Sequence, residues 1–262
     1  MKRMYVWAVL LLSFELCGLS LTSCGDDDDD VLTNVTAPDN GNDNNQDSGD
    51  NGNNNEGSEN GGIIDVNGHK AVDLGLSLKW ATCNVGANSP EEYGGYYAWG
   101  ETEEKDYYDW STYKYCNGSE NSMTKYCTDS SYGTVDNKTV LEPEDDVAHV
   151  KWGDSWRMPT IKEINELLNT NNCSWTWTTQ NGVNGYVVTS KANGNTIFLP
   201  AAGYRYLDGK NGYKKDLCGY YWSLNGYKNF GRFFDFFDNE LLHHQDNGLV
   251  RYQGNSIRPV TE

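Results

Sequence analysis

Apolar and polar positions alternate in short runs over residues 63–262, and turn residues separate these runs. Residues 63–72 place Asn67-Gly68 between two apolar stretches, which predicts a β-hairpin. Leu76 to Trp80 alternates apolar and polar side chains, as a half-buried strand does. The same reasoning predicts further strands over residues 186–189, 196–199, 220–223, 233–237 and 256–260.

One segment, residues 159–168, has the periodicity of an amphipathic helix. Thr160 and Glu163 have the spacing of a capping box, in which each side chain satisfies a backbone N–H at the start of the helix. Its apolar face would carry Ile161, Ile164, Leu167 and Leu168. One clear helix among many strands predicts an α+β domain with a mostly antiparallel sheet.

The N-terminus predicts export and lipid attachment. A basic start, Met1–Met4, precedes an apolar run that ends at Leu21, as in a secretory signal. Leu21-Thr22-Ser23-Cys24 resembles a bacterial lipobox, so residues 1–23 are predicted to be a signal peptide and Cys24 the acylated first residue of the mature chain. An ordinary secreted protein with a chance cysteine is the alternative.

Residues 24–62 are predicted to be a disordered tether, because Asn, Asp, Gly and Ser dominate and almost nothing apolar follows Val35. A Gly-rich coil over residues 31–62 would reach ~30 Å. The run Asp26 to Asp30 resembles the signal that sends lipoproteins of Bacteroidota-type bacteria to the outer face of the outer membrane. A solvated spacer is the alternative. The predicted location is therefore the outer membrane, with the domain exposed on the cell surface.

The charge excludes one class of partner. The 262 residues carry 20 Lys+Arg against 38 Asp+Glu, and residues 63–262 hold 18 of the bases and 26 of the acids. Nucleic acid is therefore not an expected ligand, because affinity for phosphate backbones comes mainly from Lys and Arg.

Aromatic residues are expected to hold the core, since the chain has nine Trp and 18 Tyr but only seven Phe. Core positions are predicted for Trp80, Trp99, Trp156 and Trp222. Ser, Thr and Asn surround three others, which are candidates for a sugar-stacking platform or for ordinary packing: Trp110, Trp175 and Trp177. Arg157 and Arg258 flank prolines in apolar settings and are expected to pair with buried carboxylates or carbonyls.

Several blocks of sequence carry a family resemblance. They are Ala71–Ala87, Glu92–Glu101, Trp156–Thr160, Leu199–Arg205, Tyr220–Ser223 and Ser256–Val260. In this order they resemble the Fibrobacter major paralogous domain (FISUMP-type) of bacterial surface lipoproteins. The resemblance implies a C-type-lectin-like fold, related to the formylglycine-generating enzymes, over residues 63–262. Similar domains serve as display proteins of diversity-generating retroelements, whose C-terminal part carries variable ligand-contacting residues.

The C-terminal segment is the candidate binding face. Tyr, Asn, Arg and His suit adaptable binding surfaces. If the display analogy holds, the contact residues are Tyr227, Asn229, Phe230, Arg232, His243, His244, Asp246, Asn247, Tyr252 and Asn255. Alternation over residues 233–237 would expose either Phe233 and Phe237 or Phe234 and Phe236, unless two layers bury both faces of the strand.

Catalytic and metal chemistry have little support in the sequence. No hydrolase elbow, zinc helix or phosphate loop occurs. The paired active-site cysteines of the related enzymes have no counterpart, because the five domain cysteines are at least 11 residues apart. Cys116 with Cys127 is the favoured disulfide, although spacing does not decide it. Glu142, Glu144, Asp145 and Asp146 are candidate Ca²⁺ ligands or, alternatively, a helix start.

The predicted function is a non-enzymatic ligand-binding module, an adhesin or display protein, without a cofactor. Its partner would be a protein or a glycan outside the cell. The alternatives are a carbohydrate-binding accessory protein or weak hydrolase of a glycan-utilisation system, and a structural surface component with no defined small ligand.

Overall fold

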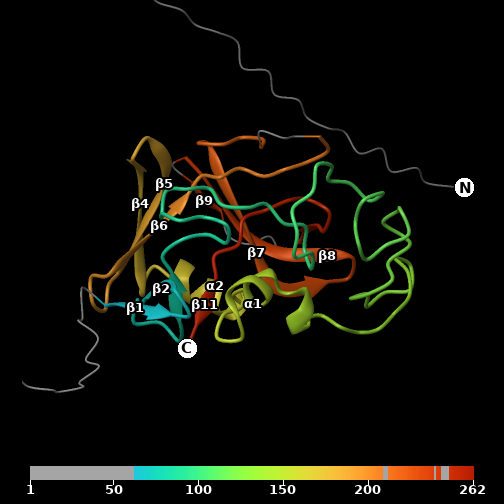
Figure 1. The fold of residues 1–262 in the computed structure, drawn as a ribbon, viewed down its shortest axis with the longest axis horizontal. Helices are drawn as coiled ribbons and strands as arrows, with labels where there is room; N and C mark the ends of the chain where they lie inside the picture. Colours follow the sequence, from blue (N-terminus) through green and yellow to red (C-terminus); the bar gives the residue numbers. More distant parts are fainter. Residues whose placement is uncertain (1–61, 209–211, 239, 243–247) are drawn as a thin grey trace, which may run out of the picture. The chain divides into compact units, whose positions relative to one another are not determined.

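The computed structural model describes residues 62–208, 212–238, 240–242 and 248–262, which Figure 1 draws in colour. Its helices are the 3₁₀ helix η1 (Pro143–Asp145), α1 (Val147–Trp152) and α2 (Ile161–Leu168). Its strands are β1 (Ile63–Val66), β2 (His69–Val72), β3 (Lys79–Ala81), β4 (Cys173–Gln180), β5 (Val183–Ser190), β6 (Thr196–Pro200), β7 (Cys218–Tyr227), β8 (Phe230–Phe237), β9 (Glu240–Leu242), β10 (Leu249–Val250) and β11 (Val260–Thr261).

The predicted signal peptide and almost all of the tether, with Cys24 and the run Asp26 to Asp30, lie outside the described residues. Among the residues that are described, no helix is long and apolar enough to cross a membrane.

The strands form three sheets, with the orders β1-β2-β3-β11, β10-β8-β7 with β9 also paired to β8, and β4-β5-β6. Every strand pair in these sheets is antiparallel. The predicted α+β class with mostly antiparallel strands is confirmed. Figure 1 shows the β4-β5-β6 sheet on one side of β7 and β8 and the loops of residues 100–140 on the other.

The β7–β8 hairpin is buried on both faces. Tyr221, Phe234 and Phe236 point to one face, and Trp222 and Phe233 point to the other. All three phenylalanines are at most 3% exposed. The structure therefore confirms the alternative in which two layers cover this strand, and neither predicted face of exposed phenylalanines exists.

Two hydrophobic cores lie on these two faces. We call the first the sheet core; its larger members are Val72, Leu74, Trp80, Ile164, Leu167, Leu168, Tyr186, Val188, Ile197, Leu199, Tyr221, Phe234, Phe236 and Val260. We call the second the loop core; its aromatic members are Tyr96, Tyr97, Trp99, Tyr108, Tyr113, Tyr115, Tyr126, Trp152, Trp156, Trp222, Phe233 and Tyr252. All four tryptophans predicted to be core are buried.

Helix α2 begins as the sequence predicts. The Thr160 hydroxyl accepts from the Glu163 N–H, and the Glu163 carboxylate accepts from the Thr160 N–H. Both halves of the capping box are thus present. The apolar stripe of α2 packs into the sheet core through Ile164, Leu167 and Leu168.

A second helix, α1, corrects the prediction of a single clear helix. Asp146 caps it by accepting from the N–H groups of Ala148 and His149. Burial raises the pKa of the Asp146 carboxyl, although hydrogen bonds from backbone N–H groups act in the opposite direction. The acidic segment is therefore a helix start, which is one of the two interpretations that the sequence allows.

Three other expectations need correction. The predicted strand over residues 76–80 begins only at Lys79, and that over 256–260 reduces to β11. The eight-residue strand β4, which carries Trp175 and Trp177, was not predicted at all.

The favoured disulfide between Cys116 and Cys127 is not formed, because both residues are free thiols. Their Sγ atoms lie 3.0 and 3.2 Å from the carbonyl oxygens of Trp110 and Asp129.

The arginine predictions are confirmed. Arg258 is fully buried and donates to the carbonyl oxygens of Ala81 and Phe198 at 3.0 and 2.9 Å. Arg157 pairs with Glu163 at 2.6 Å. The Arg258 contacts join Ala81 of β3 to Phe198 of β6, so this side chain connects two sheets.

Candidate ligand-binding surface

The free end of the β7–β8 hairpin is the best-defined part of the predicted binding face, and we call residues 226–232 the hairpin tip. Tyr227 and Phe230 are paired across a two-residue turn made of Lys228 and Asn229. Lys228 has a φ of 54°, a left-handed conformation that costs about 1 kcal/mol in a residue other than glycine. The turn is held in this conformation by contacts beneath it.

Trp99 and Arg251 fasten the tip from the loop core. The Arg251 Nη2 donates to the carbonyl oxygens of Lys228 and Tyr126 at 2.9 and 2.8 Å. Its guanidinium carbon lies 4.5 Å from the centre of the Trp99 ring. A Cβ at Gly231 would come within 2.7 Å of that ring, so the glycine is needed for this close approach. Packing on buried groups holds the backbone of the tip rigidly.

The exposed group at the tip is an aromatic ring beside two cations. Tyr227 is 40% exposed. Lys228 Nζ lies 5.5 Å from the ring centre, and the guanidinium carbon of Arg232 lies 5.6 Å from it. Both distances are within the range of cation–π attraction, which restricts the tyrosine side chain. Phe230 and Arg232 are half-buried.

Burial removes several residues from the predicted contact set. Asn229 and Asn255 are fully buried and Tyr252 is 8% exposed, so none of the three is an exposed contact residue in this conformation. The two asparagines look like surface residues in the sequence because polarity alone says nothing about tertiary contacts. The other four predicted residues lie outside the described ones: His243, His244, Asp246 and Asn247.

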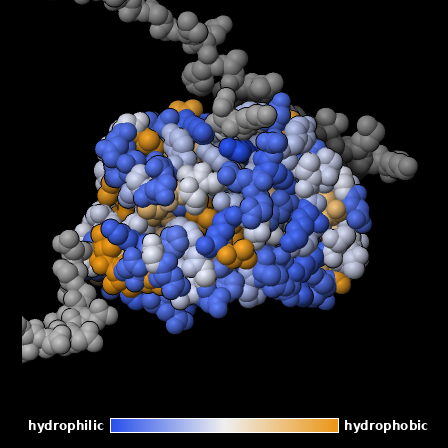
Figure 2. Space-filling view, viewed as in Figure 1, coloured by the Kyte–Doolittle hydropathy of each residue, from blue (hydrophilic) through white to orange (hydrophobic). Residues whose placement is uncertain are grey.

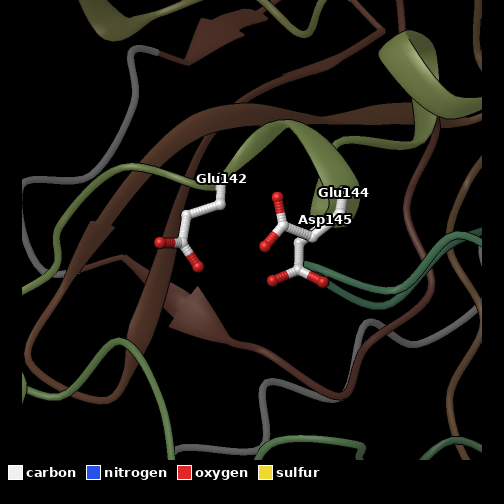
Figure 3. Close-up of side chains that lie close together, drawn as sticks. All are labelled: Glu142, Glu144 and Asp145. Atoms are coloured by element: carbon white, nitrogen blue, oxygen red, sulfur yellow. The ribbon is translucent and has the colours of Figure 1, made fainter.

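The candidate calcium ligands Glu142, Glu144 and Asp145 do come together. Their nearest oxygens lie within 4.8 Å of one another, and Figure 3 shows the three carboxylates close together at the short helix η1. Asp146 does not join them, because it caps α1 and accepts from the Met158 N–H at 2.9 Å.

Lysine ammonium groups already neutralise this cluster. Lys125 Nζ lies 2.6 Å from Asp145 Oδ2 and 2.5 Å from Glu142 Oε2. Lys138 also pairs with Glu142. A calcium ion needs six to eight oxygen ligands, whereas here an ammonium group lies between the carboxylates. The geometry therefore favours an ion-pair network over a calcium site.

The same network perturbs the Asp145 carboxyl. Burial by itself raises its pKa, but hydrogen bonds from Lys125, Tyr115 and Tyr126 outweigh burial and hold that pKa at about 2. Asp145 is 2% exposed, yet it is fully charged at neutral pH because these donors surround it.

The tryptophans proposed for sugar stacking are half-buried. Trp175 and Trp177 pack against the sheet core, and the Trp175 indole N–H donates to the Leu167 carbonyl at 3.2 Å. Trp110 packs edge-on against Tyr113 and Tyr252, with ring centres 5.8 and 4.9 Å apart. Packing, the ordinary alternative for these residues, accounts for most of their surface.

A groove of about 490 Å³ lies where β1–β2 meets the loop after β3, and sequence reasoning missed it. His69, Cys83 and Trp152 are among its lining residues. The His69 ring stacks on Trp152 at 3.9 Å, and burial lowers the pKa of the imidazole. The Cys83 thiol lies 3.4 Å from the Thr82 hydroxyl. Because the His69 ring is stacked on Trp152 and its imidazole pKa is lowered, His69 is interpreted as a packing residue of the groove.

No protein-family model matches the chain, and neither a curated protein nor a solved structure matches it.

Proposed function

We propose that this chain is a lipid-anchored protein of the outer bacterial surface whose domain, residues 63–262, is C-type-lectin-like and binds a ligand without catalysis. The ligand is a protein or a glycan outside the cell. The hairpin tip is the contact surface, and Tyr227, Phe230 and Arg232 are its contact residues among those described.

One observation carries this proposal: an exposed aromatic and cationic tip rests on a buried support. Tyr227 is exposed while Trp99 and Arg251 beneath it are fully buried. Side chains at such a tip can change without disturbing the core, which is what a display surface requires. A rigid backbone also lowers the entropy lost on binding.

The fold assignment has separate support. The blocks that resemble FISUMP-type domains supply buried residues on both sides of β7–β8, including Trp80 in the sheet core and Trp156 in the loop core. Motif residues with these positions would maintain a common fold. A glycosidase needs two carboxylates facing a cleft. The carboxylates of Glu142 and Asp145 are instead paired with lysine ammonium groups, so this cluster favours binding over hydrolysis.

The location is tested first. Cys24→Ala should release the protein from the membrane fraction, because the acyl chains attach through this thiol. Proteinase treatment of intact cells should remove the wild-type domain. Unchanged membrane association of the variant, or complete protection of the wild type from proteinase, would contradict the proposed location.

Binding is tested with the full chain purified in detergent, against arrays of glycans and of host extracellular proteins, with and without EDTA. Tyr227→Ala and Arg232→Ala should abolish capture of any protein or charged glycan found, because the tip carries the cations Lys228 and Arg232. EDTA should leave capture unchanged. Tyr107→Ala is the matched control, because Tyr107 is exposed to the same degree, 41%. Capture that survives both tip substitutions would show that the tip is not the contact surface.

Diversification has its own test at the level of the gene. Codons 227–255 should match a nearby template repeat, except at adenine positions, beside a reverse transcriptase. Absence of such a repeat would remove the diversification part of the proposal and leave ligand binding intact.

A further inference from the structure

A second surface carries aromatic rings that the hairpin tip does not use. Residues 204–206, between the positive-φ residues Gly203 and Leu207, are paired on both edges like a short strand, and Tyr204 exchanges backbone hydrogen bonds of 3.1 and 2.7 Å with Tyr213. Arg205 forms the equivalent pair with Gly254, at 2.7 and 2.9 Å. Because alternate residues of an extended chain point to opposite sides, Tyr204 and Tyr206 lie on the same side of this segment.

The rings of this segment continue into neighbouring segments. Tyr204 stacks on Tyr213, with ring centres 5.7 Å apart and planes 23° apart. Tyr206 contacts Tyr252 at 5.7 Å, and Tyr252 contacts Trp110 at 4.9 Å. We call these five residues the aromatic row.

Two rings of the aromatic row are exposed to solvent, and the rings that they contact are more deeply buried. Tyr213 and Tyr206 are 41% and 36% exposed, whereas Tyr252 is buried. Tyr220, on β7, contacts Tyr204 edge-on at 5.1 Å and so supports it from the side of the hairpin. The exposed rings are therefore held in place before any ligand arrives, which reduces the entropy cost of binding.

The electrostatic surroundings narrow the class of ligand. Burial, a hydrogen bond with Tyr206 and the nearby carboxylates of Asp109 and Glu120 all raise the pKa of Tyr252. Negative charge at this end of the row disfavours an anionic ligand. Carboxylates and tyrosine hydroxyls do accept hydrogen bonds from hydroxyl groups, which neutral sugars carry in abundance.

A large apolar partner surface has less support. Figure 2 shows one face of the molecule on which hydrophobic residues form small groups among hydrophilic ones. Stable protein interfaces usually have an apolar centre, and contiguous apolar patches usually mark them. Tyrosine rings separated by polar groups suit a ligand that alternates apolar faces and hydroxyl edges.

We propose that the aromatic row binds a neutral polysaccharide, with the exposed faces of Tyr206 and Tyr213 stacking on the C–H faces of its sugar rings. This site is distinct from the hairpin tip, and it stands or falls independently of the ligand proposed there. No bond is made or broken in this interaction.

The test is affinity electrophoresis of the full chain, purified in detergent, through gels that contain a soluble β-glucan, α-glucan or β-mannan. At least one neutral polymer should retard the wild type. Tyr206→Ala and Tyr213→Ala should each weaken retardation by roughly ten-fold, the order expected for loss of one aromatic contact. Tyr206→Trp keeps a stacking face and should bind.

Ile63→Ala, at an apolar side chain of 42% exposure on β1 and outside both the aromatic row and the hairpin tip, is the control and should be retarded like the wild type. Thermal unfolding of each variant checks that it is folded. The proposal is overturned if no neutral polymer retards the wild type, if alginate alone does so, or if folded Tyr206→Ala and Tyr213→Ala are retarded normally. Loss of retardation in Tyr227→Ala alone would move glycan binding to the tip.

Discussion

The two cores on either side of β7–β8 are built from different materials. In the sheet core, nine of the sixteen buried residues are Val, Leu or Ile. In the loop core these types account for five of twenty-five, and Tyr, Trp and Phe account for twelve. The side chains of both cores are buried, so the difference does not reflect the degree of burial.

The backbone explains the difference. Strands β4–β6 and helix α2 satisfy their own N–H and C=O groups, so plain aliphatic side chains can fill the space between them. Residues 82–142 form no named strand or helix, and many of their carbonyls need other donors. Tyrosine and tryptophan supply both apolar area and one such donor.

Individual contacts support this explanation. The Tyr96 hydroxyl donates to the Ala202 carbonyl and the Tyr108 hydroxyl to the Tyr96 carbonyl, both at 2.6 Å. The indole N–H groups of Trp99 and Trp222 donate to the carbonyls of Ser223 and Tyr97, at 2.9 and 2.8 Å. Loops are thus cross-linked to β7 by side chains instead of by a sheet.

The largest expected effect comes from removing Trp99. Trp99→Ala should lower the free energy of unfolding by about 4 kcal/mol, since it leaves a cavity under the tip and an unpaired carbonyl. Leu199→Ala in the sheet core should cost about 3 kcal/mol from the cavity alone. Urea unfolding measures both. A smaller cost for Trp99→Ala than for Leu199→Ala would contradict the comparison.

The ion-pair network should make the loop core sensitive to acid. Folding lowers the pKa of the Asp145 carboxyl from 3.8 to about 2. The charged Asp145 carboxylate therefore contributes about 2 kcal/mol to the free energy of unfolding. This contribution is complete above the unfolded-state pKa of the carboxyl and is lost as the pH falls through 2. The advantage of the wild type over Asp145→Asn should therefore shrink between pH 5 and about 2 in urea unfolding. Asp154→Asn, at a side chain 98% exposed, is the control for loss of one carboxylate and should leave the free energy of unfolding nearly unchanged.

Removing single hydroxyls separates the two cores most directly. Tyr96→Phe, Tyr108→Phe and Tyr113→Phe should each cost about 1 kcal/mol, because each leaves a loop carbonyl without its donor; the Tyr113 hydroxyl donates to the Trp99 carbonyl at 2.9 Å. Tyr186→Phe in the sheet core should cost almost nothing, since its hydroxyl lies 3.4 Å from the Phe237 carbonyl, whereas Tyr221→Phe should cost about 1 kcal/mol because its hydroxyl donates to the Pro200 carbonyl at 2.8 Å. Costs near zero for all three loop-core variants would show that the hydroxyls do not hold the loops.

The smallest effect is expected at the hairpin tip, which rests on Trp99 of the loop core. Lys228→Gly should raise the free energy of unfolding by about 0.5 kcal/mol, because glycine adopts the left-handed conformation without strain. Lys228→Ala retains the strain and serves as the control. Differential scanning calorimetry measures both, and a destabilised glycine variant would mean that the lysine stem itself supports the tip.

The sequence predicts the local parts of this fold well. Asn67-Gly68 specifies the first hairpin, and Thr160 with Glu163 specifies the start of α2, because both signals depend only on nearby residues. Strand β4 was missed because Ser, Thr and Asn surround its tryptophans, although Asn181-Gly182 gives the same hairpin signal between β4 and β5 as Asn67-Gly68 gives between β1 and β2. Its alternation becomes meaningful only when one face is known to meet Phe236.

The candidate surfaces were predicted less completely. Tyr227 and Arg232 stand out by residue type and do lie together at the tip. The burial of Asn229 and Asn255 depends on contacts with distant segments, which no local pattern reveals. Tyr206 was missed because its neighbours in the aromatic row, Tyr252 and Trp110, are far away in the chain, and Tyr213 was missed because its stacking on Tyr204 depends on the path of the intervening loop.

The pairing of β11 with β3 has a consequence for the time at which the domain can form. Val260 lies opposite Trp80, so the last strand completes a sheet begun some 180 positions earlier in the chain. A polypeptide that lacks residues 260–261 has no β11 and cannot complete the sheet around Trp80. Long-range pairing of this kind is also intrinsically slow. Local hairpins such as β4–β5 are therefore expected to form early in folding, and the sheet that holds Trp80 closes late.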